Sequence, residues 1–159
     1  MQPEERDQLV AQYVDGYRVV ADALRKITAE ELDAAAAPGK WTTRQIIHHL
    51  ADSEMTAAVR FRLLLAEDRP AIKAYDQDRF AGRLHYERPH EASLELFRSV
   101  RSSTAELMAC LTEADWLREG THSEMGRFGL DTWLRTYAPH AHRHADQIRA
   151  ARGAASGKP

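Results

Sequence analysis

Cysteine is almost absent from this chain: the 159 residues include a single one, Cys110, so no disulfide can form within it. Cys110 lies in an apolar stretch between Ala109 and Leu111, and we expect its thiol to be buried and unreactive. No apolar run approaches the roughly 20 residues that cross a bilayer, and the acidic start of the chain lacks the apolar segment of a secretory signal. The default expectation is therefore a cytoplasmic protein.

The chain also lacks an excess of positive or of negative side chains. The chain has 22 lysines and arginines against 24 aspartates and glutamates, which leaves a formal net charge of -2. This balance gives no reason to expect nucleic acid or an anionic membrane as a partner. Hydrophobic residues make up 43% and charged residues 29% of the sequence, as is ordinary for a globular protein. The length fits a single domain with one core.

The alternation of polar and apolar residues that marks β-strands is not convincing anywhere, and helical periodicity dominates. Four long helices are predicted at about residues 4–27, 42–67, 91–111 and 131–152. Short helices are expected near residues 28–36, 77–81 and 112–115, and the glycine-rich segment 118–130 is expected to be a loop or a small hairpin. We therefore expect an all-α four-helix bundle in one domain, residues 1–152, followed by a disordered tail at 153–159.

Pro139 falls inside the fourth predicted helix, which Asp131 should cap. A proline there removes one backbone hydrogen bond and clashes with the carbonyl of Arg135, so the helix should bend just before His140. The bend could set the direction of a functional side chain, or it could simply follow the core.

Two of the eight histidines, His140 and His144, are four residues apart and can share one face of a helix. Helical periodicity places both at the apolar stripe of the fourth helix, and it places His49 beside the apolar face of the second. By the same angles His48 and His142 should point to solvent. Three imidazoles could hold zinc, nickel, iron or cobalt and leave one coordination position open, as in catalytic sites. The alternative is that these histidines are hydrogen-bonded side chains of an ordinary core.

Other polar residues can be placed near this site by their angles. Asp52 could orient a ligand imidazole, and Gln147 could contact His144. Glu54 falls on the apolar face of its helix, where it would be an acid–base group or one half of a buried ion pair with an arginine. Trp41, Trp116 and Trp133 are expected only to pack the bundle. Arg60 and Arg62 are expected to form a solvated face of the second helix.

Three segments resemble motifs of the DinB/YfiT-like superfamily, and the resemblance extends from about Leu9 to Ile148. They are Lys40-Trp41-Thr42-Thr43-Arg44-Gln45-Ile46-Ile47-His48-His49-Leu50-Ala51-Asp52-Ser53-Glu54, Ile72-Lys73-Ala74-Tyr75-Asp76 and Tyr137-Ala138-Pro139-His140-Ala141-His142-Arg143-His144. The chain departs from the family at Ala74, where proline is expected.

The resemblance implies an up-down-down-up four-helix bundle, often a homodimer, in which His49, His140 and His144 hold one nickel or zinc ion. Members of the family are described as metal-dependent hydrolases, and some related proteins are S-transferases that use a low-molecular-weight thiol such as bacillithiol, mycothiol or glutathione. The substrate would be a small electrophilic molecule, and Tyr75 and Asp76 could line its pocket. The alternative function is a non-catalytic stress or sensor protein that binds a metal or a small ligand.

Overall fold

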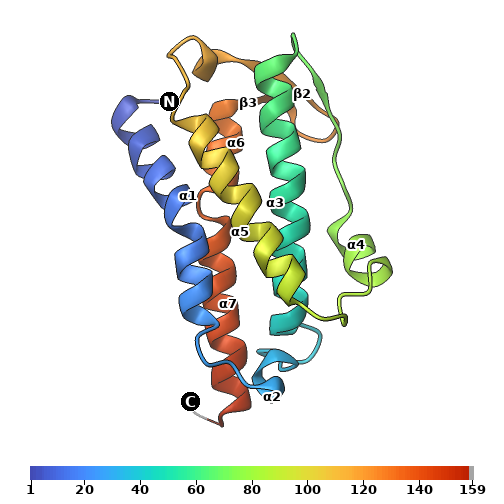
Figure 1. Cartoon of the computed structure of the whole chain (residues 1–159). Coiled ribbons are helices and arrows are strands. Elements are labelled where there is room, and N and C mark those ends of the chain that lie inside the picture. The colour runs from blue at the N-terminus through green and yellow to red at the C-terminus, as the bar shows by residue number, and fades with distance from the viewer. Residues whose placement is uncertain (158–159) are drawn as a thin grey trace.

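The computed structural model describes residues 1–157, in which four long helical rods lie side by side (Figure 1). The rods are α1 (Pro3–Ala23), α3 (Thr43–Ala66), α5 (Glu91–Met108) and the consecutive pair α6 (Leu130–Tyr137) and α7 (His140–Ala155). In Figure 1, α1 and the α6–α7 rod run in one direction, whereas α3 and α5 run in the other. The neighbours α3 and α5 are therefore parallel and need a long crossover between them. The predicted up-down-down-up four-helix bundle is confirmed.

Capping boxes fix where two helices begin. At the start of α2 (Ala29–Leu32), Thr28 and Glu31 each accept a hydrogen bond from the backbone N–H of the other. Thr42 and Gln45 form the same reciprocal pair at the start of α3. The second box bears directly on the site, because it fixes the origin of α3 fewer than two turns before His49.

The fourth rod is interrupted just before His140, at the position where the bend was predicted. Pro139, which has no N–H to donate, lies between the last residue of α6, Tyr137, and the first residue of α7, His140. The residue that precedes α6 as its N-cap is Gly129, so the prediction that Asp131 caps this helix was wrong. The helix also continues to Ala155, three residues into the tail that was predicted to be disordered; residues 158–159 of that tail lie outside the described residues.

A small three-stranded sheet closes one end of the bundle. β2 (Glu119–His122) and β3 (Gly126–Gly129) form a hairpin, one of the two alternatives expected for this segment, and β1 (Ala71–Ile72) pairs with β2 in parallel. The sequence did not predict β1, because two residues are too few to show a period. Gly120 is required in β2: a Cβ atom there would lie 2.3 Å from the carbonyl oxygen of Pro70.

The remaining connections are short helical pieces. The crossover from α3 to α5 contains α4 (Gln77–Arg83), which begins where a short helix was predicted and extends two residues further. A 3₁₀ turn, η1 (Asp115–Leu117), follows α5 in place of the predicted short helix near residues 112–115. None of the helices in residues 1–157 is long and apolar enough to cross a membrane.

The core consists of two apolar clusters stacked along the bundle. One surrounds Trp133, which is fully buried, packs on Tyr13 and Phe61, and donates its indole N–H to the carbonyl of Ala57 at 2.8 Å. The members of the other cluster include Val20, Ile47, Leu50, Phe97, Ala145 and Ile148. All four rods contribute to the core, so the α1, α3, α5 and α7 positions near the histidines are fixed by packing.

Cys110 is exposed, so the prediction that it is buried was wrong. The apolar periodicity of α5 ends at Met108, and Cys110 lies in the turn that follows. Its neighbour Leu111 packs against the core instead.

Candidate metal centre

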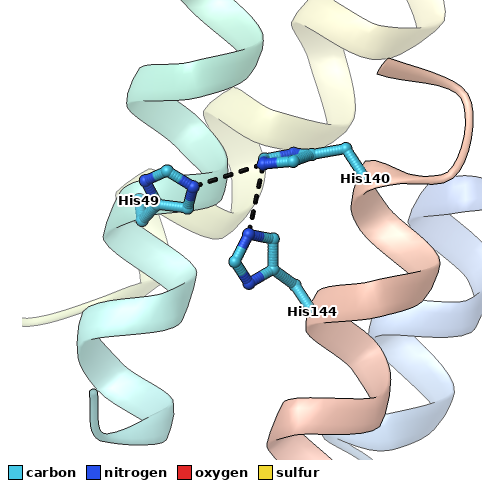
Figure 2. Close-up of side chains that lie close together, drawn as sticks. All are labelled: His49, His140 and His144. Carbon is cyan, nitrogen blue, oxygen red and sulfur yellow. Dashed lines mark hydrogen bonds between the residues drawn. The ribbon is translucent and has the colours of Figure 1, made fainter. Parts of the chain in front are cut away.

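Three imidazoles from two helices converge between α3 and α7 (Figure 2). The Nε2 atom of His140 lies 3.3 Å from Nε2 of His49 and 3.1 Å from Nε2 of His144. One ring nitrogen of each residue falls within 4.8 Å of the other two. Within residues 1–157, no other group of three histidines, cysteines or carboxylates gathers in this way. The structure thus brings together the three histidines that helical periodicity selected.

His49 is fixed by its helix and by a neighbouring indole. Only 2% of its surface is exposed. The Trp41 ring, immediately before the Thr42 cap of α3, lies with its centroid 4.7 Å from that of the imidazole. Trp41 was expected only to pack the bundle, but it also forms one wall of the site.

The other two imidazoles come from the first two turns of α7. Because His140 is the first residue of that helix, its direction depends on the break at Pro139. His144 is oriented by Gln147, whose side-chain oxygen lies 2.8 Å from the His144 Nδ1 atom. An amide oxygen can only accept, so the proton sits on Nδ1 and the Nε2 lone pair faces the other two rings. The predicted contact of Gln147 with the site is therefore present.

Burial keeps all three imidazoles neutral. It lowers the pKa of His49 to about 3, with a smaller effect from His144. It also lowers the pKa of His144 to about 4, although the hydrogen bond to Gln147 opposes this shift. The pKa of His140 is lowered well below its ordinary value, again chiefly by burial. Metals bind neutral imidazole, so this environment removes proton competition at neutral pH.

The donor set fits a divalent transition-metal ion. Nitrogens of a tetrahedral zinc site, each about 2.0–2.1 Å from the metal, are about 3.4 Å apart, close to the 3.1 and 3.3 Å separations found here. His140 has at most one hydrogen on Nε2, so it cannot donate to both neighbouring nitrogens. A cation at the centre could accept a lone pair from all three rings, and three histidines leave a further position for another ligand.

A cavity of about 630 Å³ adjoins the three imidazoles. It falls within the usual range for small-molecule pockets. Its wall includes two cationic side chains, Lys40 and Arg143, and one carboxylate, Asp78. Neither Lys40 nor Arg143 was predicted to lie at the site, although each belongs to a histidine motif, because lysines and arginines are common on protein surfaces.

The predicted pocket loop is only partly in place. The cavity wall includes Gln77 and Asp78, but Tyr75 and Asp76 are not among the residues that line it. The pocket residues of this loop therefore lie two positions further along the chain than predicted. Asp76 is the N-cap of α4 and accepts a hydrogen bond from the backbone N–H of Arg79. The Tyr75 ring packs on Phe80.

The histidines that were expected in solvent are not fully exposed. His48 is completely buried, with Nδ1 2.8 Å from the hydroxyl of Ser93 and Nε2 3.1 Å from the carbonyl of Arg88. The prediction failed because α5 and the crossover cover the face of α3 opposite α7. His142 is half-buried against α1, where its Nε2 atom lies 3.1 Å from the carbonyl of Gln12.

Asp52 has a partner other than the three imidazoles. It accepts a hydrogen bond of 2.7 Å from the Tyr86 hydroxyl, and the described residues show no hydrogen bond from it to the histidine cluster. Its predicted role in orienting a ligand is therefore not seen.

Glu54 is buried in an ion pair with Arg101 and accepts a hydrogen bond from Tyr13, so the predicted ion pair is present. Arg60 is also buried, contrary to the prediction that it belongs to a solvated face.

Comparisons with known proteins agree with this geometry. The chain matches the DinB superfamily model over residues 12–148. A "putative metal-dependent hydrolase" of Oceanobacillus iheyensis is 34% identical over 131 residues, which span 82% of this chain and 76% of the relative. A protein of Bacillus mycoides with the same description is 30% identical over 146 residues, which span 92% and 84%.

A solved structure shares the whole fold. YfiT from Bacillus subtilis, described as "a probable metal-dependent hydrolase with an unusual four-helix bundle topology", superposes with a TM-score of 0.89 at 27% identity, covering 100% of this chain and 91% of that one. The fold and the histidine cluster thus define a four-helix bundle of the YfiT type. All three histidines lie in the matched region, and the chain belongs to the DinB superfamily.

Proposed function

We propose that this protein is a metal-dependent enzyme that acts on a small electrophilic molecule, either by hydrolysis or by transfer to a low-molecular-weight thiol. The observation that carries the proposal is the convergence of His49, His140 and His144 beside a cavity of about 630 Å³. The relatives described as metal-dependent hydrolases support the first reaction. The volume of the cavity supports the second, because it could hold a thiol co-substrate together with the electrophile.

The three histidines would hold one nickel or zinc ion, since their donor atoms are all imidazole nitrogens. When bound, the ion would act as a Lewis acid and lower the pKa of water or a thiol in its open position. The protein residues supply the rest. Gln147 keeps the His144 proton on Nδ1, and Trp41 shields His49 from bulk water.

The cationic side chains of the cavity would bind an anionic group of the substrate or of the thiol. Lys40 and Arg143 both line the cavity wall beside the imidazoles. A carboxylate placed between them would leave the reactive sulfur or carbonyl free to reach the open position. A thiol that carries carboxylates, such as bacillithiol, suits this arrangement.

The test is metal content followed by turnover. Untagged protein purified without a metal-affinity column should contain one nickel or zinc ion per chain by mass spectrometry. His49→Gln and His140→Gln should contain none, whereas the matched control His142→Gln should keep its metal, because that ring faces α1 instead. Hydrolysis of p-nitrophenyl esters, or conjugation of monochlorobimane to bacillithiol, mycothiol or glutathione, should require the metal. Full metal occupancy in the His140→Gln protein would contradict the proposal.

A non-catalytic metal- or ligand-binding protein is the alternative. Stoichiometric metal without turnover of any ester or thiol would favour it.

We also propose that the protein is a homodimer. Light scattering of the protein as it elutes from a size-exclusion column measures this directly.

A further inference from the structure

Arg101 connects all four helical rods from inside the bundle. It comes from α5, and only 2% of its surface is exposed. Its guanidinium pairs with the Glu54 carboxylate of α3, donates to the Tyr13 carbonyl of α1 at 2.7 Å, and donates to the Tyr137 carbonyl of α6 at 3.4 Å. The same guanidinium lies 3.9 Å from the centroid of the Tyr13 ring. No other arginine in residues 1–157 is as deeply buried.

A glycine makes room for this guanidinium. A Cβ atom on Gly16 would lie 2.5 Å from both Nε and Nη2 of Arg101. Gly16 is in the middle of α1, where glycine costs about 1 kcal/mol relative to alanine. The close approach of α1 to Arg101 therefore depends on a residue that helix propensity alone would not favour.

Tyr137, which Arg101 contacts, is also held at its other end. It is the last residue of α6, so its carbonyl lies among those that a helix terminus leaves without a helical donor. The Tyr137 hydroxyl accepts a hydrogen bond of 2.8 Å from Arg60, and Arg60 donates a second one to the carbonyl of Lys73 at 2.6 Å. Three residues later comes His140, whose ring centroid is 6.3 Å from that of Tyr137.

We propose that Arg101 and Arg60 are positioning residues for the metal centre. By holding Tyr137 at its carbonyl and at its hydroxyl, they fix the break between α6 and α7 and so the direction in which His140 meets the other two imidazoles. An apolar core of the same volume would often be at least as stable as a buried ion pair. The role of the charged pair is therefore to fix a position: through Arg101 it connects the Tyr137 carbonyl, at the helix break, to α1, α3 and α5.

The inference rests on the proposed metal centre, and Co²⁺ binding tests both with different outcomes. Replacing Arg101 alone would leave the Glu54 carboxylate buried and unpaired, so the informative variant is the double one, Arg101→Met with Glu54→Met, which removes both charges together. We expect it to fold, with a circular dichroism melt close to that of the wild type. We expect its Co²⁺ affinity to fall about tenfold or more, with altered d–d absorption bands, because His140 is no longer held.

Two further variants separate positioning from folding. Gly16→Ala keeps both charges but displaces the guanidinium, and Tyr137→Phe removes only the bond to Arg60; each should weaken Co²⁺ binding and shift its spectrum. The control Tyr13→Phe removes a hydrogen bond to Glu54 while leaving the contacts of Arg101, so its Co²⁺ spectrum should match the wild type.

The outcomes are distinct. A wild-type protein that binds no Co²⁺ would overturn the proposed metal centre itself. A wild type that binds Co²⁺, together with a folded double variant of unchanged affinity and spectrum, would overturn the positioning role alone. If the double variant does not fold, unchanged Co²⁺ binding in Gly16→Ala and Tyr137→Phe would overturn it.

Discussion

Acid should destabilise the metal-free protein through its buried imidazoles. Burial lowers the pKa of His49 to about 3 and that of His144 to about 4 from the ordinary 6.5. In the unfolded chain both rings titrate near that ordinary value. Between the two sets of pKa values the unfolded state binds protons that the folded state does not, so the free energy of unfolding falls as the pH falls. Above the unfolded pKa neither state is protonated and the effect disappears.

The magnitude follows from the size of the pH step. One pKa unit corresponds to about 1.4 kcal/mol, and about pH 5 lies roughly 1.5 units below the unfolded pKa and still above both folded values. Each ring should then cost about 2 kcal/mol, and the pair roughly 4 kcal/mol, between about pH 7 and about pH 5. His49 and His144 are 2% and 9% exposed, so solvent screening reduces this little. The loss is a large part of the stability of a typical domain, about 5–15 kcal/mol.

Urea unfolding of chelator-treated protein at both pH values measures the effect. Comparing the wild type with His144→Gln cancels the contribution of the many carboxylates that also titrate. The wild type should lose about 2 kcal/mol more than His144→Gln over the same step. Equal losses in the wild type and His144→Gln would refute the reasoning, because the His144 ring would then be protonated as easily in the folded state as in the unfolded one.

Three further predictions test other parts of the account. His48→Gln should keep its metal by mass spectrometry and His49→Gln should lose it, since only the second ring faces the cluster; equal retention would contradict the assignment. Trp133→Ala should lower the free energy of unfolding by about 3–5 kcal/mol in chemical denaturation, because it empties the fully buried centre of one core cluster. Lys40→Met and Arg143→Met should raise KM for a thiol that bears carboxylates by several-fold and leave kcat nearly unchanged; an unchanged KM would show that the cavity cations do not bind the thiol.

Much of the site could be predicted from helical angles. The period of α3 puts His49 beside one apolar stripe, and the period of α7 puts His144 within a second stripe and His140 at its edge. Packing those stripes together brings the rings within reach of one another. The interruption between α6 and α7 could also be predicted, because Pro139 lacks a backbone N–H whatever packs around it. Features that depend on a single residue in this way can be predicted from the sequence.

The errors at His48 and Arg60 have a common physical cause: both residues lie on faces of α3 that segments distant in sequence cover. His48 lies opposite the α7-facing side of α3, yet it is buried because α5 and the crossover pack there. The sequence pattern predicts that Arg60 is a surface residue, but it is buried against Tyr137 and the carbonyl of Lys73. The sequence of α3 does not indicate which segments cover His48 and Arg60. The ion pair of Glu54 could be predicted, since a carboxylate on an apolar face requires a cation from some part of the chain.

The central claim is that one metal ion sits among the three imidazoles, and anomalous X-ray scattering from crystals of untagged protein tests it most directly. Data collected at the nickel and zinc absorption edges should show a single peak per chain, within bonding distance of Nε2 of His49, His140 and His144. A peak bound by other residues, or well-ordered imidazoles hydrogen-bonded to one another around a site with no anomalous signal after metal supplementation, would contradict the account.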